Sequence, residues 1–92
     1  MRVHFFIYPK YHLGAKQDLK YVHILDADDE KITQGTSIID EFIKERSIDY
    51  VEIDYKITDG DVQHDYSIKY DPIVDVDISL RMYLSAILWD YE

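Results

Sequence analysis

Aspartate and glutamate are the most abundant side chains in this sequence that could bind a partner or do chemistry. The 92 residues contain 19 of them against 10 lysines and arginines, for a formal net charge of −9. Their distribution is uneven: residues 1–25 are basic, whereas residues 47–77 hold nine carboxylates and two lysines. Carboxylates hold metals, transfer protons or bind cationic surfaces. The spacing of these groups distinguishes the three uses.

The spacing gives little support to a metal site. The acidic run that begins at Asp26 has Lys31 where a calcium loop needs glycine, and Ser37 where it needs glutamate. The absence of cysteine excludes disulfides, thiolate nucleophiles and cysteine-based zinc sites. No metal-ligand spacing is formed by the four histidines, which are His4, His12, His23 and His64. We therefore expect no metal, no cofactor and no catalytic residue.

One short pattern is typical of an enzyme. Asp54-Tyr55-Lys56 is a D-x-K triplet on an expected strand, similar to half of the PD-(D/E)xK nuclease motif. In those nucleases two carboxylates hold a metal and the lysine assists the attacking water, and here Asp40 or Asp49 would supply the missing acid. The triplet arises easily by chance on an alternating strand, and a chain of this charge repels DNA. A solvated, charged strand face is the preferred interpretation.

Hydrophobic periodicity predicts a single α+β domain over residues 1–92. Strands are expected at residues 3–8 and 20–26, a helix at 37–46, two strands at 51–58 and 62–70, and a helix at 78–89. Asp77 is the expected N-cap of the last helix. The order ββαββα predicts a mostly antiparallel sheet with both helices on one face.

The two strands at 51–58 and 62–70 form an expected hairpin around Asp59-Gly60, a preferred two-residue turn. This turn would pair Thr58 with Asp61 and so place Asp54 directly opposite Asp65. Like charges in that position destabilise a sheet. The register therefore predicts a face on which carboxylates are gathered for a partner, with His64 on the buried side.

The acidic balance disfavours direct binding of nucleic acid and favours a basic protein partner. Carboxylates at every second strand residue lie about 6–7 Å apart, close to the scale of phosphates along a nucleic-acid strand. We therefore expect a DNA-mimicking face. The candidate acidic residues are Asp49, Glu52, Asp54, Asp59, Asp61, Asp65, Asp71 and Asp75. Among nine tyrosines, Tyr50, Tyr70 and Tyr91 form a candidate aromatic rim around that face.

In its length, acidity, lack of cysteine, richness in tyrosine and small α+β pattern, the whole chain resembles the anti-restriction nuclease (Arn) proteins of T-even phages. That resemblance implies a DNA mimic that inhibits a McrBC-type restriction endonuclease in the host cytoplasm. It also implies a homodimer and no catalysis or cofactor. The resemblance transfers no individual residue, so the acidic residues named above follow from charge and register alone.

Two other interpretations stay open from the residues. The first is an immunity-type protein that blocks a basic toxin with an acidic surface, and the second is a minimal metal-dependent nuclease built on the D-x-K triplet. No signal peptide and no apolar stretch of about 20 residues is recognisable, so we expect a cytoplasmic protein without a membrane role.

Overall fold

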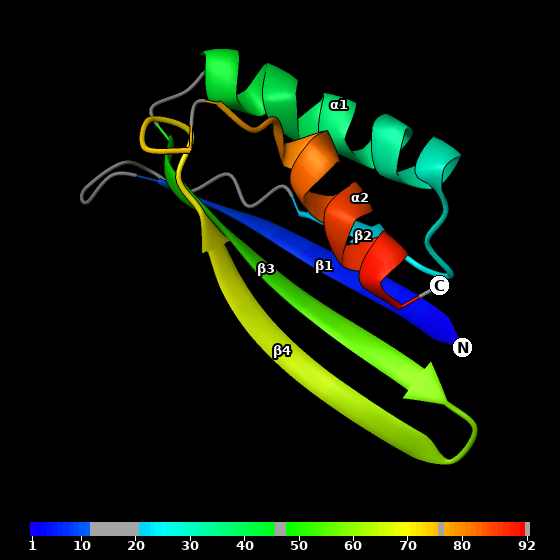
Figure 1. Cartoon of the computed structure of the whole chain (residues 1–92). Helices are drawn as coiled ribbons and strands as arrows, with labels where there is room; N and C mark the ends of the chain where they lie inside the picture. The colour runs from blue at the N-terminus through cyan, green and yellow to red at the C-terminus, as the bar shows by residue number, and fades with distance from the viewer. Residues whose placement is uncertain (12–20, 46–47, 76, 92) are drawn as a thin grey trace.

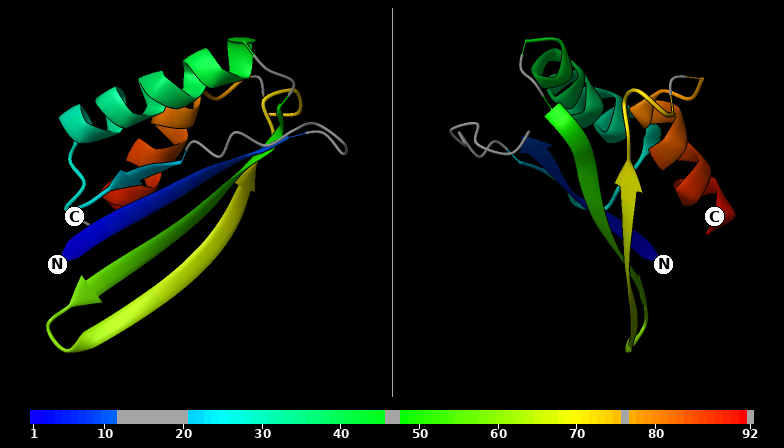
Figure 2. Two further views of the ribbon diagram at one scale, coloured as in Figure 1. Left: turned by 180° about the vertical axis from the view of Figure 1, so that it is seen from behind. Right: turned by 90° about the vertical axis from the view of Figure 1, so that its left-hand side faces the viewer.

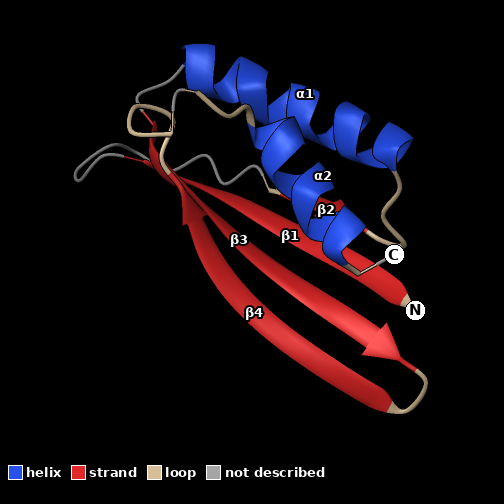
Figure 3. Ribbon diagram, viewed as in Figure 1, coloured by secondary structure: helices blue, strands red, loops and turns tan. Residues whose placement is uncertain are grey.

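The computed structural model describes residues 1–11, 21–45, 48–75 and 77–91. Its elements are β1 (Arg2–Tyr11), β2 (Val22–Ile24), α1 (Asp29–Glu45), β3 (Ile48–Asp59), β4 (Val62–Tyr70) and α2 (Leu80–Asp90) (Figure 1). The predicted α+β class and the order ββαββα are confirmed (Figure 3). None of the helices in these ranges is both long and apolar enough to span a membrane.

The four strands form one antiparallel sheet in the order β2-β1-β3-β4. Both helices lie on the same face of this sheet, as Figure 2 shows from two further sides. Alternate residues of the two central strands point at the helices, so Phe5, Ile7 and Ile53 are fully buried. The helices complete the core with Ile32, Ile39, Leu80, Leu84 and Leu88. The opposite face of the sheet carries neither of the two described helices, and we call it the outer face.

Helix α1 begins eight residues earlier than the sequence predicts. Asp28 caps it, because the backbone N–H of Lys31 donates to the Asp28 Oδ1 at 2.8 Å. The extra turns include Gly35, where an added Cβ would lie only 2.8 Å from Ile24 Cδ1. Glycine therefore lets α1 approach β2 closely. The predicted last residue, Arg46, lies outside the described residues.

The predicted register of the β3–β4 hairpin is wrong by two residues. Asp59 pairs with Val62, so the two-residue turn is Gly60-Asp61, and Gly60 has a φ of +61°. A glycine with positive φ at the first turn position is typical of a type II′ turn. In this register Asp54 faces Ser67 and not Asp65. The predicted opposition of like charges is therefore absent from this pair.

The other boundaries differ in detail. β2 is shorter than expected, and the predicted start of that strand at Lys20 lies outside the described residues. Helix α2 begins at Leu80 and is capped by Ser79, whose Oγ accepts from the N–H of Met82 at 3.2 Å. Asp77 is therefore not the N-cap. His64 has the predicted facing, because it pairs with the buried Ile57, but it is exposed, because it lies on the edge strand β4 close to the hairpin turn.

Candidate acidic interface

The eight predicted acidic residues lie along the β3–β4 hairpin and the connection that follows it. Four of them are exposed, namely Asp49, Asp59, Asp61 and Asp65, and the other four are partly buried. The ten residue-to-residue steps from Asp61 to Asp71, which flank β4, span about 32–34 Å at the rise of a strand. We call the hairpin with its seven carboxylates, from Asp49 to Asp71, the acidic ribbon. Its length is close to one turn of duplex DNA, about 34–36 Å.

The outer face of the sheet is not a purely acidic surface, which corrects the expected gathering of carboxylates on one face. Its carboxylates are Glu52, Asp54 and Asp65, and its cations are Arg2, Lys10, Lys56 and Lys69. The Lys10 ammonium lies 3.6 Å from a carboxylate oxygen of Glu52. Lys56 stands directly opposite Asp65, and Lys69 directly opposite Glu52. The middle of the ribbon is therefore mixed in sign on this face.

Aromatic rings lie under the lysines of this face. The Lys56 ammonium is 5.5 Å from the ring centre of Phe6, and the Lys69 ammonium is 4.7 Å from that of Tyr50. Cation–π attraction of this kind holds the lysine stems flat over the sheet. Tyr50 is therefore part of the outer face and not of a separate rim.

Most of the described carboxylates nevertheless form no ion pair with a described lysine or arginine. The described residues include 17 carboxylates and seven lysines and arginines. Ion pairs between described side chains reach only two of these carboxylates, Asp26 with Arg2 at 3.6 Å and Glu52 with Lys10. The excess negative charge is concentrated at the ends of the ribbon, with Asp59 and Asp61 at its tip and Asp49 and Asp71 at the other end, where Asp75 of the following connection adds to it.

Asp71 and Asp75, which follow β4, also accept hydrogen bonds from the backbone of the connection to α2. Asp71 accepts from the backbone N–H groups of Ile73 and Val74 at 2.8 and 3.1 Å, and Asp75 accepts from the N–H of Asp71 at 2.9 Å. These bonds fold the connection between β4 and α2 into tight turns. Asp71 and Asp75 therefore have a structural role besides any contact with a partner.

Burial is the main cause of two raised pKa values at this end of the ribbon. Burial raises the pKa of the Asp40 carboxyl on α1, and Lys44 lowers it in part. Burial also raises the pKa of the Tyr70 phenol, and the charges of Asp40 and Asp75 raise it further. Asp40 on α1 and Asp75 in the connection after β4 therefore both raise the pKa of Tyr70.

Tyr70 does not belong to an exposed aromatic rim. Only 6% of it is exposed, and its hydroxyl donates to the carbonyl oxygen of Ile78 at 2.7 Å. Tyr91 is half-buried at the end of α2, close to Tyr55 and Tyr66, whose rings stack at 4.9 Å. Burial raises the pKa of Tyr55, and the Tyr66 phenol raises it further. The tyrosines that gather at the surface are thus Tyr55, Tyr66 and Tyr91.

A second apolar stripe on α2 is a feature that the sequence analysis missed. Ile78, Met82 and Trp89 are exposed at 45%, 53% and 62%. Their helical spacing, continued by Ala86, is the signal in the sequence that would have found them. Ile78, Met82 and Ala86 of this stripe line a groove of about 310 Å³ against the inner face of the hairpin, whose other lining residues are Tyr55, Ile68, Tyr83, Ile87 and Asp90. We call it the α2 groove.

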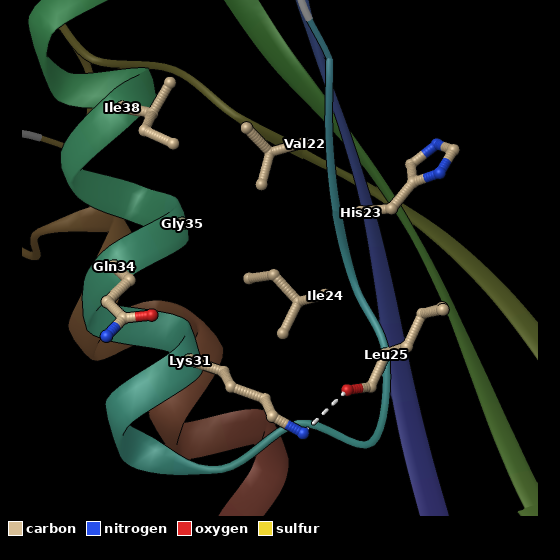
Figure 4. A pocket seen from close by; sticks show the side chains of 8 residues that line it. All are labelled: Val22, His23, Ile24, Leu25, Lys31, Gln34, Gly35 and Ile38. Carbon is tan, nitrogen blue, oxygen red and sulfur yellow. Dashed lines mark hydrogen bonds between the residues drawn. The ribbon is translucent and has the colours of Figure 1, made fainter.

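A separate hollow of about 450 Å³ lies between β2 and α1, lined mainly by Val22, Ile24 and Ile38 (Figure 4). The Lys31 ammonium at its mouth donates to the carbonyl oxygens of Leu25 and Asp26 at 3.3 and 3.2 Å. That lysine therefore stabilises the β2–α1 turn, and the hollow follows from the packing of the two elements.

The residues of the D-x-K triplet do not meet an upstream acid. Asp54 and Lys56 point from the outer face, whereas Asp40 lies on α1, which covers the other face. Asp49 sits where the pairing of β1 with β3 shifts its register. Within the described ranges, no three histidine, aspartate or glutamate side chains gather closely enough to hold a metal ion.

Comparison with known proteins found no relative of this chain. The chain matches no protein-family model, no curated protein and no solved structure. Its function is therefore argued from its own residues.

Proposed function

We propose that this protein binds a basic, DNA-binding protein through the acidic ribbon and thereby keeps DNA out of that protein's binding site. The observation that carries the proposal is the row of seven carboxylates along about one turn's length of DNA, of which only Glu52 forms an ion pair with a described cation. Lysines and arginines that line a DNA-binding cleft are the complement of such a row. The protein acts by occupying the cleft and needs no catalytic step.

The mixed outer face sets the orientation of this binding. Because Lys56 and Lys69 stand opposite two of the carboxylates there, that face attracts a basic cleft weakly. The hairpin tip with Asp59 and Asp61, and the opposite end with Asp49, Asp71 and Asp75, are better placed. We therefore expect the ribbon to bind by its two ends and its open edge, spanning the cleft lengthwise.

The charge density of the ribbon predicts its response to salt. Duplex DNA carries one charge per about 1.7 Å and releases many condensed counterions on binding. Seven carboxylates over about 34 Å condense far fewer. Binding should therefore weaken as salt rises, but with a shallower dependence than that of duplex DNA on the same partner.

The test starts by immobilising the chain, capturing proteins from a bacterial lysate and identifying those that salt elutes. A ribbon variant, Asp54→Asn with Asp59→Asn and Asp61→Asn, should then capture at least tenfold less of the DNA-binding proteins. A matched control removes three carboxylates from α1 instead: Glu30→Gln, Glu41→Gln and Glu45→Gln. Both variants have the same net charge. Equal losses in the two would show that net charge alone, and not the ribbon, attracts these proteins.

A further inference from the structure

Strand β4 is the open edge of the sheet. Its nine residues pair with β3 on one side, and no other described strand borders it. An edge strand leaves a row of backbone N–H and C=O groups free to pair with another chain. Long edges of this kind bind extended peptides in many proteins, where the peptide joins the sheet as a further strand.

The hairpin turn determines which groups point to the open side. In a two-residue turn the carbonyl of the residue before it accepts from the N–H of the residue after it, so Val62 faces β3. Facing alternates along an antiparallel strand. The N–H and C=O groups at the open edge therefore belong to Gln63, Asp65, Ser67 and Lys69. These four residues present an edge of about 20 Å.

The α2 groove lies beside this edge, on the inner face of the hairpin. Its lining includes Ile68 of β4, the Asp90 carboxylate, and Ile78, Met82 and Ala86 of the exposed stripe. The Tyr66 ring is 42% exposed and stacks on Tyr55 in the same region. Such a groove accepts apolar side chains along its floor, and its carboxylate and aromatic faces accept cations.

We propose that β4 and the α2 groove together bind an extended segment of the basic partner, which adds to the sheet as a fifth strand. The inference rests on the proposed function and specifies how part of the partner is held. Alternate side chains of the segment would enter the groove and are apolar. The intervening ones lie on the outer face along Gln63, Asp65, Ser67 and Lys69, and the one beside Asp65 is lysine or arginine, because a strand places opposite charges side by side.

Charge favours this occupant over a second copy of the chain. Two copies would each bring a net charge of −9, whereas a basic segment is attracted to the carboxylates at both ends of β4. Self-pairing of β4 about Ser67 would still place Asp65 of one copy opposite Lys69 of the other. A second copy is therefore an explicit outcome of the test.

The probe is a fluorescent nine-residue peptide of alternating arginine and valine, titrated with the protein and followed by anisotropy. Ser67→Pro removes an N–H that the fold does not use but a fifth strand needs, and should weaken binding at least tenfold. Ser67→Ala keeps the N–H and should bind within twofold of the wild type. A peptide of equal charge whose central arginine carries a backbone N-methyl group should bind wild type as weakly as the parent peptide binds Ser67→Pro, because in an antiparallel fifth strand the N–H groups of the arginines point at β4.

Hydrogen exchange needs no variant and gives a second result. On adding the alternating peptide, the amides of Gln63, Asp65, Ser67 and Lys69 should gain protection, whereas those of His64 and Tyr66 are already protected by β3. No gain of protection at Gln63, Asp65, Ser67 and Lys69, or equal binding to Ser67→Pro and wild type, would overturn the proposal. So would light scattering that shows a wild-type dimer and a Ser67→Pro monomer, because the edge would then hold a second copy.

The same variants separate this inference from the proposed function. If Ser67→Pro captures basic proteins as well as wild type while the ribbon variant captures little, the fifth strand is wrong and the proposed function stands. If the ribbon variant captures as much as wild type, the proposed function itself is wrong.

Discussion

The cross-strand pair of Lys56 and Asp65 gives a direct test of the hairpin geometry on which the acidic ribbon depends. In the structure these residues face each other, and Asp54 faces Ser67. Had the turn been at Asp59-Gly60, Asp54 would face Asp65. Replacement of Asp65 by asparagine therefore has opposite effects in the two registers: it removes an attraction in the first and a repulsion in the second.

The expected size of the effect follows from the exposure of the pair. Cross-strand opposite charges contribute about 0.2–1 kcal/mol. Asp65 is exposed and Lys56 only partly buried, and no oxygen–nitrogen distance between them falls within 4.0 Å, so we expect the lower half of that range. For a domain of this size, about 0.2–0.5 kcal/mol corresponds to a Tm lower by about 1–4 °C.

Net charge also changes the measured stability, because removal of any carboxylate reduces the overall charge repulsion in a chain of net charge −9. Asp61→Asn, in the exposed turn, makes the same change without a cross-strand cation and is the matched control. A double-mutant cycle with Lys56→Gln and Asp65→Asn, followed by urea unfolding at low and high salt, isolates the pair. A coupling of zero, or Asp65→Asn more stable than Asp61→Asn, would refute the register.

Three further predictions concern stability. Gly35→Ala gains about 1 kcal/mol of helix propensity, but its Cβ would lie 2.8 Å from Ile24 Cδ1, and such overpacking costs about 1–3 kcal/mol. Urea unfolding should therefore show a net loss of stability, and adding Ile24→Val should reduce that loss. Tyr70→Phe removes the hydroxyl that donates to the Ile78 carbonyl and should cost about 1–2 kcal/mol in the same assay. The pKa of Asp40 is raised above 3.8, so the folded state binds its proton more tightly than the unfolded state and stability falls as pH rises through that interval. Asp40→Asn should therefore melt higher than wild type at pH 7, with the difference shrinking below pH 3.8, and an unchanged difference across pH would contradict the assignment.

The sequence was sufficient for the fold class and for which strand residues face the core. Alternation along β3 and β4 places Val51, Ile53 and Ile57 inward, and a slip of two residues leaves that pattern unchanged. The same property explains the error in register. Periodicity cannot distinguish pairings that differ by two, and the turn type, set by the positive φ of Gly60, decides between them.

Tertiary packing explains the other differences. Thr33, Gly35 and Thr36 are poor helix formers, so the sequence pattern starts α1 at residue 37. In the structure α1 packs closely on β2 through Gly35, and the Thr36 hydroxyl donates to the carbonyl of Ile32 at 2.6 Å. The mixed outer face follows from alternation alone, because Lys56 lies two residues from Asp54 and Lys69 four residues from Asp65; only the carboxylate that each lysine opposes depends on the register.

The homodimer that the family resemblance implies does not depend on the hairpin register or on where α1 begins. Light scattering of the purified chain would give twice the 11.0 kDa of one copy if that implication holds, and 11.0 kDa if it does not.

The central claim is that the acidic ribbon stands in for the phosphates of DNA, and competition measures this most directly. A captured DNA-binding protein is held on the immobilised chain at fixed salt, and a duplex of about 20 base pairs is added. The account predicts that the duplex releases the captured protein in proportion to its own affinity for that protein, and that the ribbon variant needs less duplex for release. A captured protein that stays bound while it also takes up the duplex would contradict the claim, because the two would then occupy different sites.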